Sequence, residues 1–306
     1  MSNVAILLCT FNGARFLPAQ LSSYADQTWH DWRLFASDDG SSDETAAILS
    51  QYQKTIGSNL MQIRTGPRRG FVNNFLSLIC DPSIDADYYA YSDQDDIWEP
   101  EKLTRAIEVL QKIPSHVPAV FGSRTRLIYD DGREFGLSPL FRHKPEFRNA
   151  LVQNIAGGNT MVINAAAREH LMAGGWGLHL PGHDWWTYLV TTAVGGHVHY
   201  DPTPLVKYRV HPGNIMGSNA GLTNHARRLN MVARGRFRQW IDLNVGALKP
   251  LRSRMTSENQ ALFDLFCEAR DRSFFGRQIG LLKTGIFRQT PLGNAGLIVA
   301  ALLKKL

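Results

Sequence analysis

Three carboxylates lie within four positions, at Asp93, Asp95 and Asp96, directly after the aromatic run from Tyr88 to Tyr91. The aromatic residues predict a β-strand, so the carboxylates are expected where that strand ends. Like charges this close repel one another, and a folded protein keeps them only when water or a cation neutralises them. A hard divalent cation with oxygen ligands suits such a strand end. A solvated acidic turn is the alternative that the cluster alone leaves open.

A further carboxylate, Asp184, stands beside His183 after a glycine-rich, aromatic segment from Gly174 to Gly182. The apolar run that follows predicts a helix. Aspartate directly before such a run is often a helix N-cap. An N-cap role does not exclude a catalytic role, so both interpretations of Asp184 stay open on the residues alone.

The elements that would position these groups begin with Val4 to Thr10, an apolar run of strand length. Such a run is expected for a strand buried on both faces of a mostly parallel sheet. Polar Thr10 and Asn12 follow at its carboxyl end, and helical spacing begins at Leu17. This pattern predicts one strand-helix unit.

Trp32 to Ala36 predicts a second strand, which ends in a polar turn that contains Asp38 and Asp39. Ser41 and Glu44 have the spacing of a capping box at the start of the next helix. A second strand-helix unit is therefore expected.

The segment from Arg64 to Phe75 brings glycine, proline and three arginines together before a helix start. Strands that alternate with helices of this length predict an α/β fold with a right-handed, mostly parallel sheet. Ligands of such sheets bind beyond the carboxyl ends of the strands, where all of these polar groups fall. This coincidence favours a ligand site over a solvated turn at the acidic cluster.

Further strands are predicted at Ala119 to Ile128, at Ala156 to Asn164 and at Val206 to His211. From His225 the chain becomes helical and basic. Leu229, Ala233, Phe237 and Trp240 share one face of the predicted helix, and Arg227, Arg234 and Arg238 share another. A helix of this kind either packs on its own domain or lies on a membrane surface.

The composition, with 44% hydrophobic and 20% charged residues, is that of a globular protein. Three widely separated cysteines indicate neither a disulfide framework nor a cysteine metal site. No apolar run reaches the length of a membrane span or of a signal peptide, so a cytoplasmic protein is expected. The net charge of +6 is unevenly distributed, because residues 203–306 hold 17 Lys and Arg against 5 Asp and Glu. This basic part suits an anionic partner, such as a membrane surface or a nucleic acid.

Two enzyme classes lack their motifs here. A dinucleotide-dependent dehydrogenase would need a glycine-rich turn after the first strand, where TFNGAR has a single glycine. A P-loop enzyme would need Gly-Lys followed by Ser or Thr, which is absent. A sugar nucleotidylyltransferase would also open on a glycine-rich loop with arginine, which this chain lacks.

Several motifs occur in a recognisable order, and together they resemble glycosyltransferase family 2, in particular its rhamnosyltransferase-like members. They are VAILLCTFNGARFLPAQLSS, ASDDGSSDET, RRGFVNNF, SDQDDIW and GHDWW, and the resemblance covers about residues 4–211. It implies a GT-A fold, a nucleotide-diphosphate sugar donor, a divalent metal and inversion at the anomeric carbon. It also implies a catalytic domain over residues 1–215, followed by a helical basic region over residues 216–306.

The resemblance assigns six residues to the donor nucleotide. Thr10 and Asn12 fall near the base and ribose, Asp39 falls where a carboxylate meets the pyrimidine, and Asp38 is the weaker choice for that role. Arg69 and Asn73 fall near the base and diphosphate, and Asp93 falls near the ribose.

The metal and the base follow from the same comparison. Asp95 corresponds to the ligand of Mg²⁺ or Mn²⁺, Asp96 could take that role instead, and His211 falls where some relatives supply a further metal or diphosphate ligand. Asp184 resembles the catalytic aspartate, which would take the proton from the acceptor hydroxyl. His183 would shape the site or contact the acceptor.

The sequence therefore predicts an inverting glycosyltransferase that adds a sugar, for example L-rhamnose from dTDP-L-rhamnose, to a surface polysaccharide. The expected acceptor is a lipid-linked saccharide at the inner face of the cell membrane, and the basic region would contact anionic lipid. The alternative is a membrane- or nucleic-acid-binding module on an inactive sugar-nucleotide fold, whose DNA affinity would depend on salt. Because the acidic cluster and Asp184 are both intact, no nucleic acid partner is expected.

Overall fold

The computed structural model describes residues 3–211 and 235–306. Its strands are β1 (Val4–Thr10), β2 (Trp32–Asp38), β3 (Met61–Thr65), β4 (Tyr88–Ser92), β5 (Ile97–Trp98), β6 (Ala119–Ile128), β7 (Glu134–Leu137), β8 (Val162–Asn164) and β9 (His197–Arg209). The helices of the first part are α1 (Leu17–Ala25), α2 (Thr45–Ile56), α3 (Phe71–Ile79), α4 (Lys102–Leu110), α5 (Phe147–Ala150), α6 (Ala165–Gly174) and α7 (His183–Ala193), with the 3₁₀ turn η1 (Gly158–Thr160). The second part holds α9 (Arg236–Leu248), η2 (Lys249–Arg254), α10 (Ser257–Asp271), α11 (Phe274–Thr284) and α12 (Pro291–Leu302).

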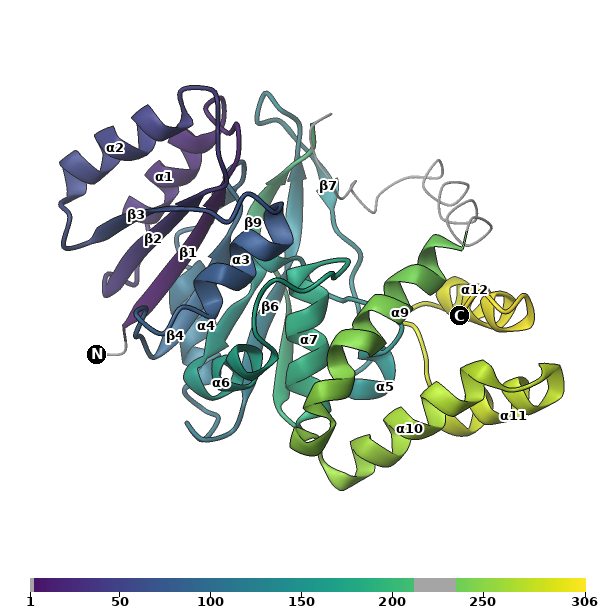
Figure 1. Cartoon of the computed structure of the whole chain (residues 1–306). Coiled ribbons are helices and arrows are strands. Elements are labelled where there is room, and N and C mark those ends of the chain that lie inside the picture. The colour runs from purple at the N-terminus through teal and green to yellow at the C-terminus, as the bar shows by residue number, and fades with distance from the viewer. Residues whose placement is uncertain (1–2, 212–234) are drawn as a thin grey trace.

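The strands form one sheet in the order β3-β2-β1-β4-β8-β6-β9-β5, with β7 paired to β6 (Figure 1). The pairs β1–β2, β1–β4, β2–β3 and β6–β9 are parallel. β8 runs antiparallel between β4 and β6, and β5 and β7 are also antiparallel to their neighbours. The α/β fold class is confirmed, with a sheet that is parallel through its N-terminal part and mixed beyond β4.

Strand β1 divides the core into two layers. Ala5, Leu7 and Cys9 pack on the side that also holds α3 and α7. Val4, Ile6 and Leu8 pack on the other side, with α1 and α4. The continuous apolar run of β1 follows from this burial on both faces.

The C-terminal helices pack on the first of these layers. Phe237 and Ile241 of α9 are buried in the same cluster as α7, and Figure 1 shows α9 lying beside α7. Among the described residues, no helix is both long and apolar enough to cross a membrane. The predicted start of the cationic helix near His225 and the predicted boundary after residue 215 lie outside the described residues.

The predicted capping box of Ser41 and Glu44 is wrong. Ser41 Oγ instead donates to Asp38 Oδ1, and Glu44 makes no side-chain capping bond. The amide of Thr45 is satisfied by Asp43 Oδ1 at 3.1 Å. The Ser-Asp-Asp-Gly-Ser turn therefore uses its hydroxyl to hold the end of β2 rather than the start of α2.

The strand predicted from Ala156 to Asn164 is shorter, because β8 begins at Val162 and Gly158 lies in η1. A Cβ at Gly158 would lie 2.2 Å from His183 Nε2, so this backbone passes too close to α7 for any side chain. Asp184 is not the N-cap of α7. Gly182 occupies that position, and Asp184 lies in the first turn.

Candidate active site

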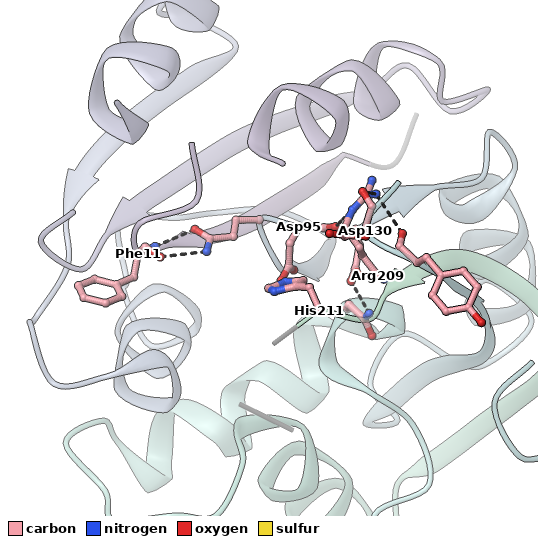
Figure 2. A network of polar contacts seen from close by, with 9 residues as sticks. Phe11, Asp95, Asp130, Arg209 and His211 are labelled. Atoms are coloured by element: carbon pink, nitrogen blue, oxygen red, sulfur yellow. Dashed lines mark hydrogen bonds and ion pairs between the residues drawn. The ribbon is translucent and has the colours of Figure 1, made fainter. Parts of the chain in front are cut away.

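Asp95 and His211 form a close pair at the carboxyl side of the sheet. His211 Nε2 lies 2.8 Å from Asp95 Oδ2, and the two side chains are only 15% and 16% exposed (Figure 2). The antiparallel pairing of β5 with β9, in register at Ile97 and Lys207, brings these distant segments together. An imidazole nitrogen and a carboxylate oxygen thus converge in a partly dry position.

Asp96 is fully buried. Its Oδ2 accepts from Asn159 Nδ2, and its Oδ1 accepts from the backbone amide of Arg209 at 3.1 Å. Burial, and next the charge of Asp95, raise the pKa of Asp96 to about 8. Asp96 is thereby engaged in joining β4, η1 and β9, whereas Asp95 faces His211.

Arg209 is a residue that the sequence did not single out. Its guanidinium donates from Nε to the Asp95 carbonyl at 3.0 Å and from Nη1 to the Asp130 carbonyl at 2.9 Å (Figure 2). It also lies 4.7 Å from the centroid of the Phe16 ring. Because the acceptors are backbone carbonyls, no residue pattern identifies them, and Arg209 resembled any exposed basic residue of a strand.

Gln94, the middle residue of the Asp-Gln-Asp motif, holds the loop after β1. Its Oε1 accepts from the Phe11 amide at 2.8 Å and its Nε2 donates to the Phe11 carbonyl at 3.0 Å (Figure 2). A Cβ at Gly13 would lie 2.1 Å from Gln94 Oε1. The glycine in TFNGAR is the sequence signal of this close approach, although its partner could not be inferred.

Asp184 lies close enough to Asp93 for their charges to interact. Burial, followed by the charges of Asp96, Asp95 and Asp184, raises the pKa of Asp93 well above its ordinary value. Burial also raises the pKa of Asp184, and hydrogen bonds from the backbone of Trp185 and Gly158 and from the Asn154 side chain partly offset that rise. Asp184 Oδ1 accepts from the Trp185 amide at 2.7 Å. The structure therefore brings the start of α7 and the end of β4 into one acidic centre.

Lys102 supplies positive charge behind this centre. It is fully buried, with Nζ 3.0 Å from the centroid of the Trp98 ring, and its charge lowers the pKa values of Asp93 and Asp96. Burial in turn lowers the pKa of Lys102 itself. A lysine at a helix start resembles a surface residue in a sequence, so this role was missed.

His183 is a buried neutral side chain. Its ring stacks on Phe75 with centroids 3.9 Å apart and meets the Tyr91 ring edge-on at 4.8 Å. Burial lowers its pKa to about 3. Within the described residues neither ring nitrogen has a hydrogen-bond partner. His183 thus shapes the ground beneath Asp184 through packing.

Thr10 and Asn12 bind the loops after β1 and β2 to one another. Thr10 Oγ1 donates to Asp38 Oδ1 at 2.8 Å, and Asn12 Oδ1 accepts from the Ser42 amide at 2.8 Å. Asn12 adopts a positive φ of 48°, which asparagine tolerates better than most residues. Both side chains are committed to this scaffold.

Asp39 connects β2 to the arginine-containing turn. Its carboxylate accepts from the backbone amides of Arg68 and Gly70, the latter at 2.9 Å, and the residue is 8% exposed. A pocket of about 350 Å³ opens beside this turn and is lined by Arg69, Asn73, Gly177 and His179. Arg69 and Asn73 are thereby confined to one concave surface that carries a cation and an amide.

The donor set suits a divalent cation that a substrate helps to hold. Among the described residues no three His, Cys, Asp or Glu side chains gather as a metal cluster. Asp95 and His211 offer one oxygen and one nitrogen ligand, and Mg²⁺ is commonly bound by one or two carboxylates together with substrate phosphates. The residues present therefore fit a shared rather than a self-sufficient metal site.

Solved structures with this arrangement of strands and helices are GT-A glycosyltransferases. The chain is similar to TarS of Staphylococcus aureus in complex with UDP-GlcNAc, with a TM-score of 0.55, 12% identity and coverage of 92% of this chain and 89% of that one. It is also similar to the mannosyltransferase PcManGT of Pyrobaculum calidifontis in complex with GDP-Man and Mn²⁺, with a TM-score of 0.54, 15% identity and coverage of 99% and 86%. The fold is thus GT-A.

The model of Glycosyl transferase family 2 matches residues 5–171, and the chain belongs to that family. It is 26% identical over 257 residues to the dTDP-rhamnosyl transferase RfbG of Shigella flexneri, which spans 79% of this chain and 84% of that protein. It is also 26% identical over 227 residues to an uncharacterized glycosyltransferase of Haemophilus influenzae, across 70% and 67% of the two chains. The protein is a glycosyltransferase.

Proposed function

We propose that the protein is an inverting glycosyltransferase that moves a sugar from a nucleotide-diphosphate donor to a hydroxyl of a saccharide acceptor. The observation that carries this proposal is the acidic centre in which Asp184 and Asp93 perturb one another, with Asp95 and His211 beside them. A base and a diphosphate-binding site at one place are what a single displacement at the anomeric carbon requires.

Asp184 is the general base of the proposal. It takes the proton of the acceptor hydroxyl while that oxygen bonds to the anomeric carbon and the bond from this carbon to the diphosphate oxygen breaks. The nucleoside diphosphate leaves from the opposite face, so the configuration inverts. The raised pKa of Asp184 suits this task, because a base is most effective when its pKa approaches the working pH.

Asp95 and His211 would hold Mg²⁺ or Mn²⁺. Bound there with the donor diphosphate, the cation would neutralise the charge of the leaving group. Asp96 is the weaker candidate ligand, because both of its oxygens already accept hydrogen bonds inside the protein. Arg209 would fix the backbone of Asp95 for this role through its bond to the carbonyl oxygen.

The donor nucleotide would lie along the carboxyl ends of β1, β2 and β4. Arg69 and Asn73 offer a cation and an amide to a diphosphate, in a pocket open to solvent. Asp39 and Asp93 would meet the base and the ribose. Thr10 and Asn12 would contribute through the loop that their side chains hold in place.

L-Rhamnose from dTDP-L-rhamnose is the proposed sugar, on the strength of the name of the Shigella relative. A saccharide of a growing surface polysaccharide, carried on a membrane lipid, is the proposed acceptor. Such an acceptor would bring the enzyme to the surface of the membrane.

Calorimetry with dTDP-L-rhamnose, UDP-N-acetylglucosamine and GDP-mannose, each with Mg²⁺ or with EDTA, tests the donor and the metal together. We expect one nucleotide to bind, and to bind more weakly in EDTA. Asp184→Asn should keep this affinity and lose turnover by a factor of about 10² or more. Asp31→Asn, at an exposed position just before β2 and far from the centre, is the matched control. Absence of binding to every nucleotide sugar would refute the proposal.

A further inference from the structure

Helices α11 and α12 expose an unusual amount of apolar surface. Half of the 18 large hydrophobic side chains that are exposed in the described chain lie between positions 274 and 303. They are Phe274, Phe275, Ile279, Leu282, Leu292, Ile298, Val299, Leu302 and Leu303. Scattered exposed apolar residues need no explanation, but a concentration of this kind marks an interaction surface.

The two faces of α11 have different surroundings. Gly280 and Leu281 face the protein, since a Cβ at Gly280 would lie 2.6 Å from Ala269 Cβ of α10. Phe275, Ile279 and Leu282 follow one another at helical spacing and are 78%, 56% and 79% exposed. The exposed stripe is therefore additional to the stripe that holds α11 in place.

Helices α11 and α12 are joined to each other and to the sheet domain. Arg277 Nε and Gln278 Nε2 both donate to the Ala301 carbonyl, at 3.0 and 3.1 Å. Between the helices, Arg288 Nη1 donates to the Val152 carbonyl at 3.0 Å, and Asn149 Nδ2 donates to the Phe287 carbonyl at 2.9 Å. The exposed surface thus belongs to a fixed part of the molecule (Figure 1).

The charge around this surface has one sign. Residues 272–306 contain six Lys and Arg and no Asp or Glu. Lys283 lies beside Leu282, and Lys304 and Lys305 follow Leu303. Apolar side chains bordered by cations match the interface of a bilayer that contains anionic lipid, where the rings and aliphatic chains enter the acyl boundary.

Two other occupants fit less well. A second copy of the chain would bring this cationic border against itself, which like-charge repulsion opposes. A membrane span would need about 20 apolar residues, and α11 and α12 have 11 and 12. Both helices have the length to lie in the plane of the membrane surface rather than to cross it.

We propose that the face formed by Phe275, Ile279 and Leu282 of α11 and by the exposed residues of α12 binds the surface of an anionic bilayer. The inference deepens the membrane contact of the proposed function and places it on a defined surface. It also moves this contact away from α9, whose Phe237 and Ile241 are buried in the core.

Sedimentation of the full chain with phosphatidylcholine vesicles, with and without phosphatidylglycerol, tests the proposal. We expect binding to the anionic vesicles that weakens with salt, and much less binding to the neutral ones. The variant F275S/I279S/L282S should lose about tenfold or more of this binding. The matched control L60S/L137S/L140S changes three exposed leucines elsewhere and should bind as the unaltered protein does.

Three results would overturn the proposal: no binding to anionic vesicles, equal binding to both vesicle types, or binding that survives in F275S/I279S/L282S. Sedimentation velocity without lipid identifies a surface between copies, because a dimer that this variant abolishes would assign the face to a second chain. Nucleotide-sugar calorimetry on the same variant shows that it is folded. It also separates failure of the membrane surface from failure of the transfer reaction.

Discussion

At the scale of single residues, the behaviour of Asp184 depends on opposing influences on its carboxylate. Burial disfavours the ionised form, while the amides of Trp185 and Gly158 and the side chain of Asn154 stabilise it. The net effect raises the pKa above the ordinary 3.8. A carboxylate held in this way remains ionised near neutral pH and has more affinity for a proton than an exposed aspartate has.

The rate should therefore fall on the acid side at a higher pH than an ordinary aspartate would give. A general base works ionised, so kcat declines as pH falls through the raised pKa of Asp184. Asn154→Ala removes a hydrogen bond to the ionised form and should move this decline to higher pH. A pH profile of kcat for both proteins measures the shift. An unmoved or lowered midpoint in Asn154→Ala would contradict the role assigned to Asp184.

Residue types identified most of the acidic centre but not its supports. Asp93, Asp95, Asp184 and His211 were found because charged side chains at strand ends and helix starts are visible in a sequence. Arg209 and Gln94 act on backbone groups, which carry no residue signature. Choosing between Asp95 and Asp96 required knowledge of which carboxylate turns inward, and a pair of adjacent aspartates does not reveal that.

At the scale of elements, the contact between η1 and α7 positions the start of the catalytic helix. Gly158→Ala would place a methyl group against His183 Nε2, where the ring is already stacked on Phe75. Overpacking of this kind costs about 1–3 kcal/mol in the free energy of unfolding. Urea denaturation measures the change, and a loss of turnover beyond the loss of folded protein would report displacement of Asp184.

Gly246→Ala is the opposite case and serves as the control. Gly246 lies within α9, and a Cβ added there would meet no other atom within 4 Å, so alanine should stabilise the protein by about 0.5–1 kcal/mol. If both variants destabilised the protein equally, the close approach at His183 would not be the cause.

Elements with a clear period were predicted well. The runs that became β1, β2 and β6 were located within a few residues. The region from Ala156 to Asn164 was misjudged because its glycines permit a close approach of η1 to α7, which no local pattern indicates. The antiparallel insertion of β8 between β4 and β6 likewise depends on contacts between distant segments.

At the scale of the whole molecule, the acidic centre lowers the stability of the metal-free protein near neutral pH. The folded state raises the pKa values of Asp93, Asp96 and Asp184, so between the unfolded value of 3.8 and these raised values it binds more protons than the unfolded chain. This contribution to stability is therefore gained as pH falls through the raised pKa values, and it is lost as pH rises.

A divalent cation at Asp95 and His211 should replace those protons. Mn²⁺ at about 100 times its dissociation constant should add about 2.7 kcal/mol to the free energy of unfolding, seen as a rise in Tm. The rise should shrink as pH falls, because protons compete for the same carboxylates. Asp95→Asn should abolish it, and Asp264→Asn, in a surface ion pair with Arg252, should leave it intact. A rise that persisted in Asp95→Asn would place the cation elsewhere in the molecule.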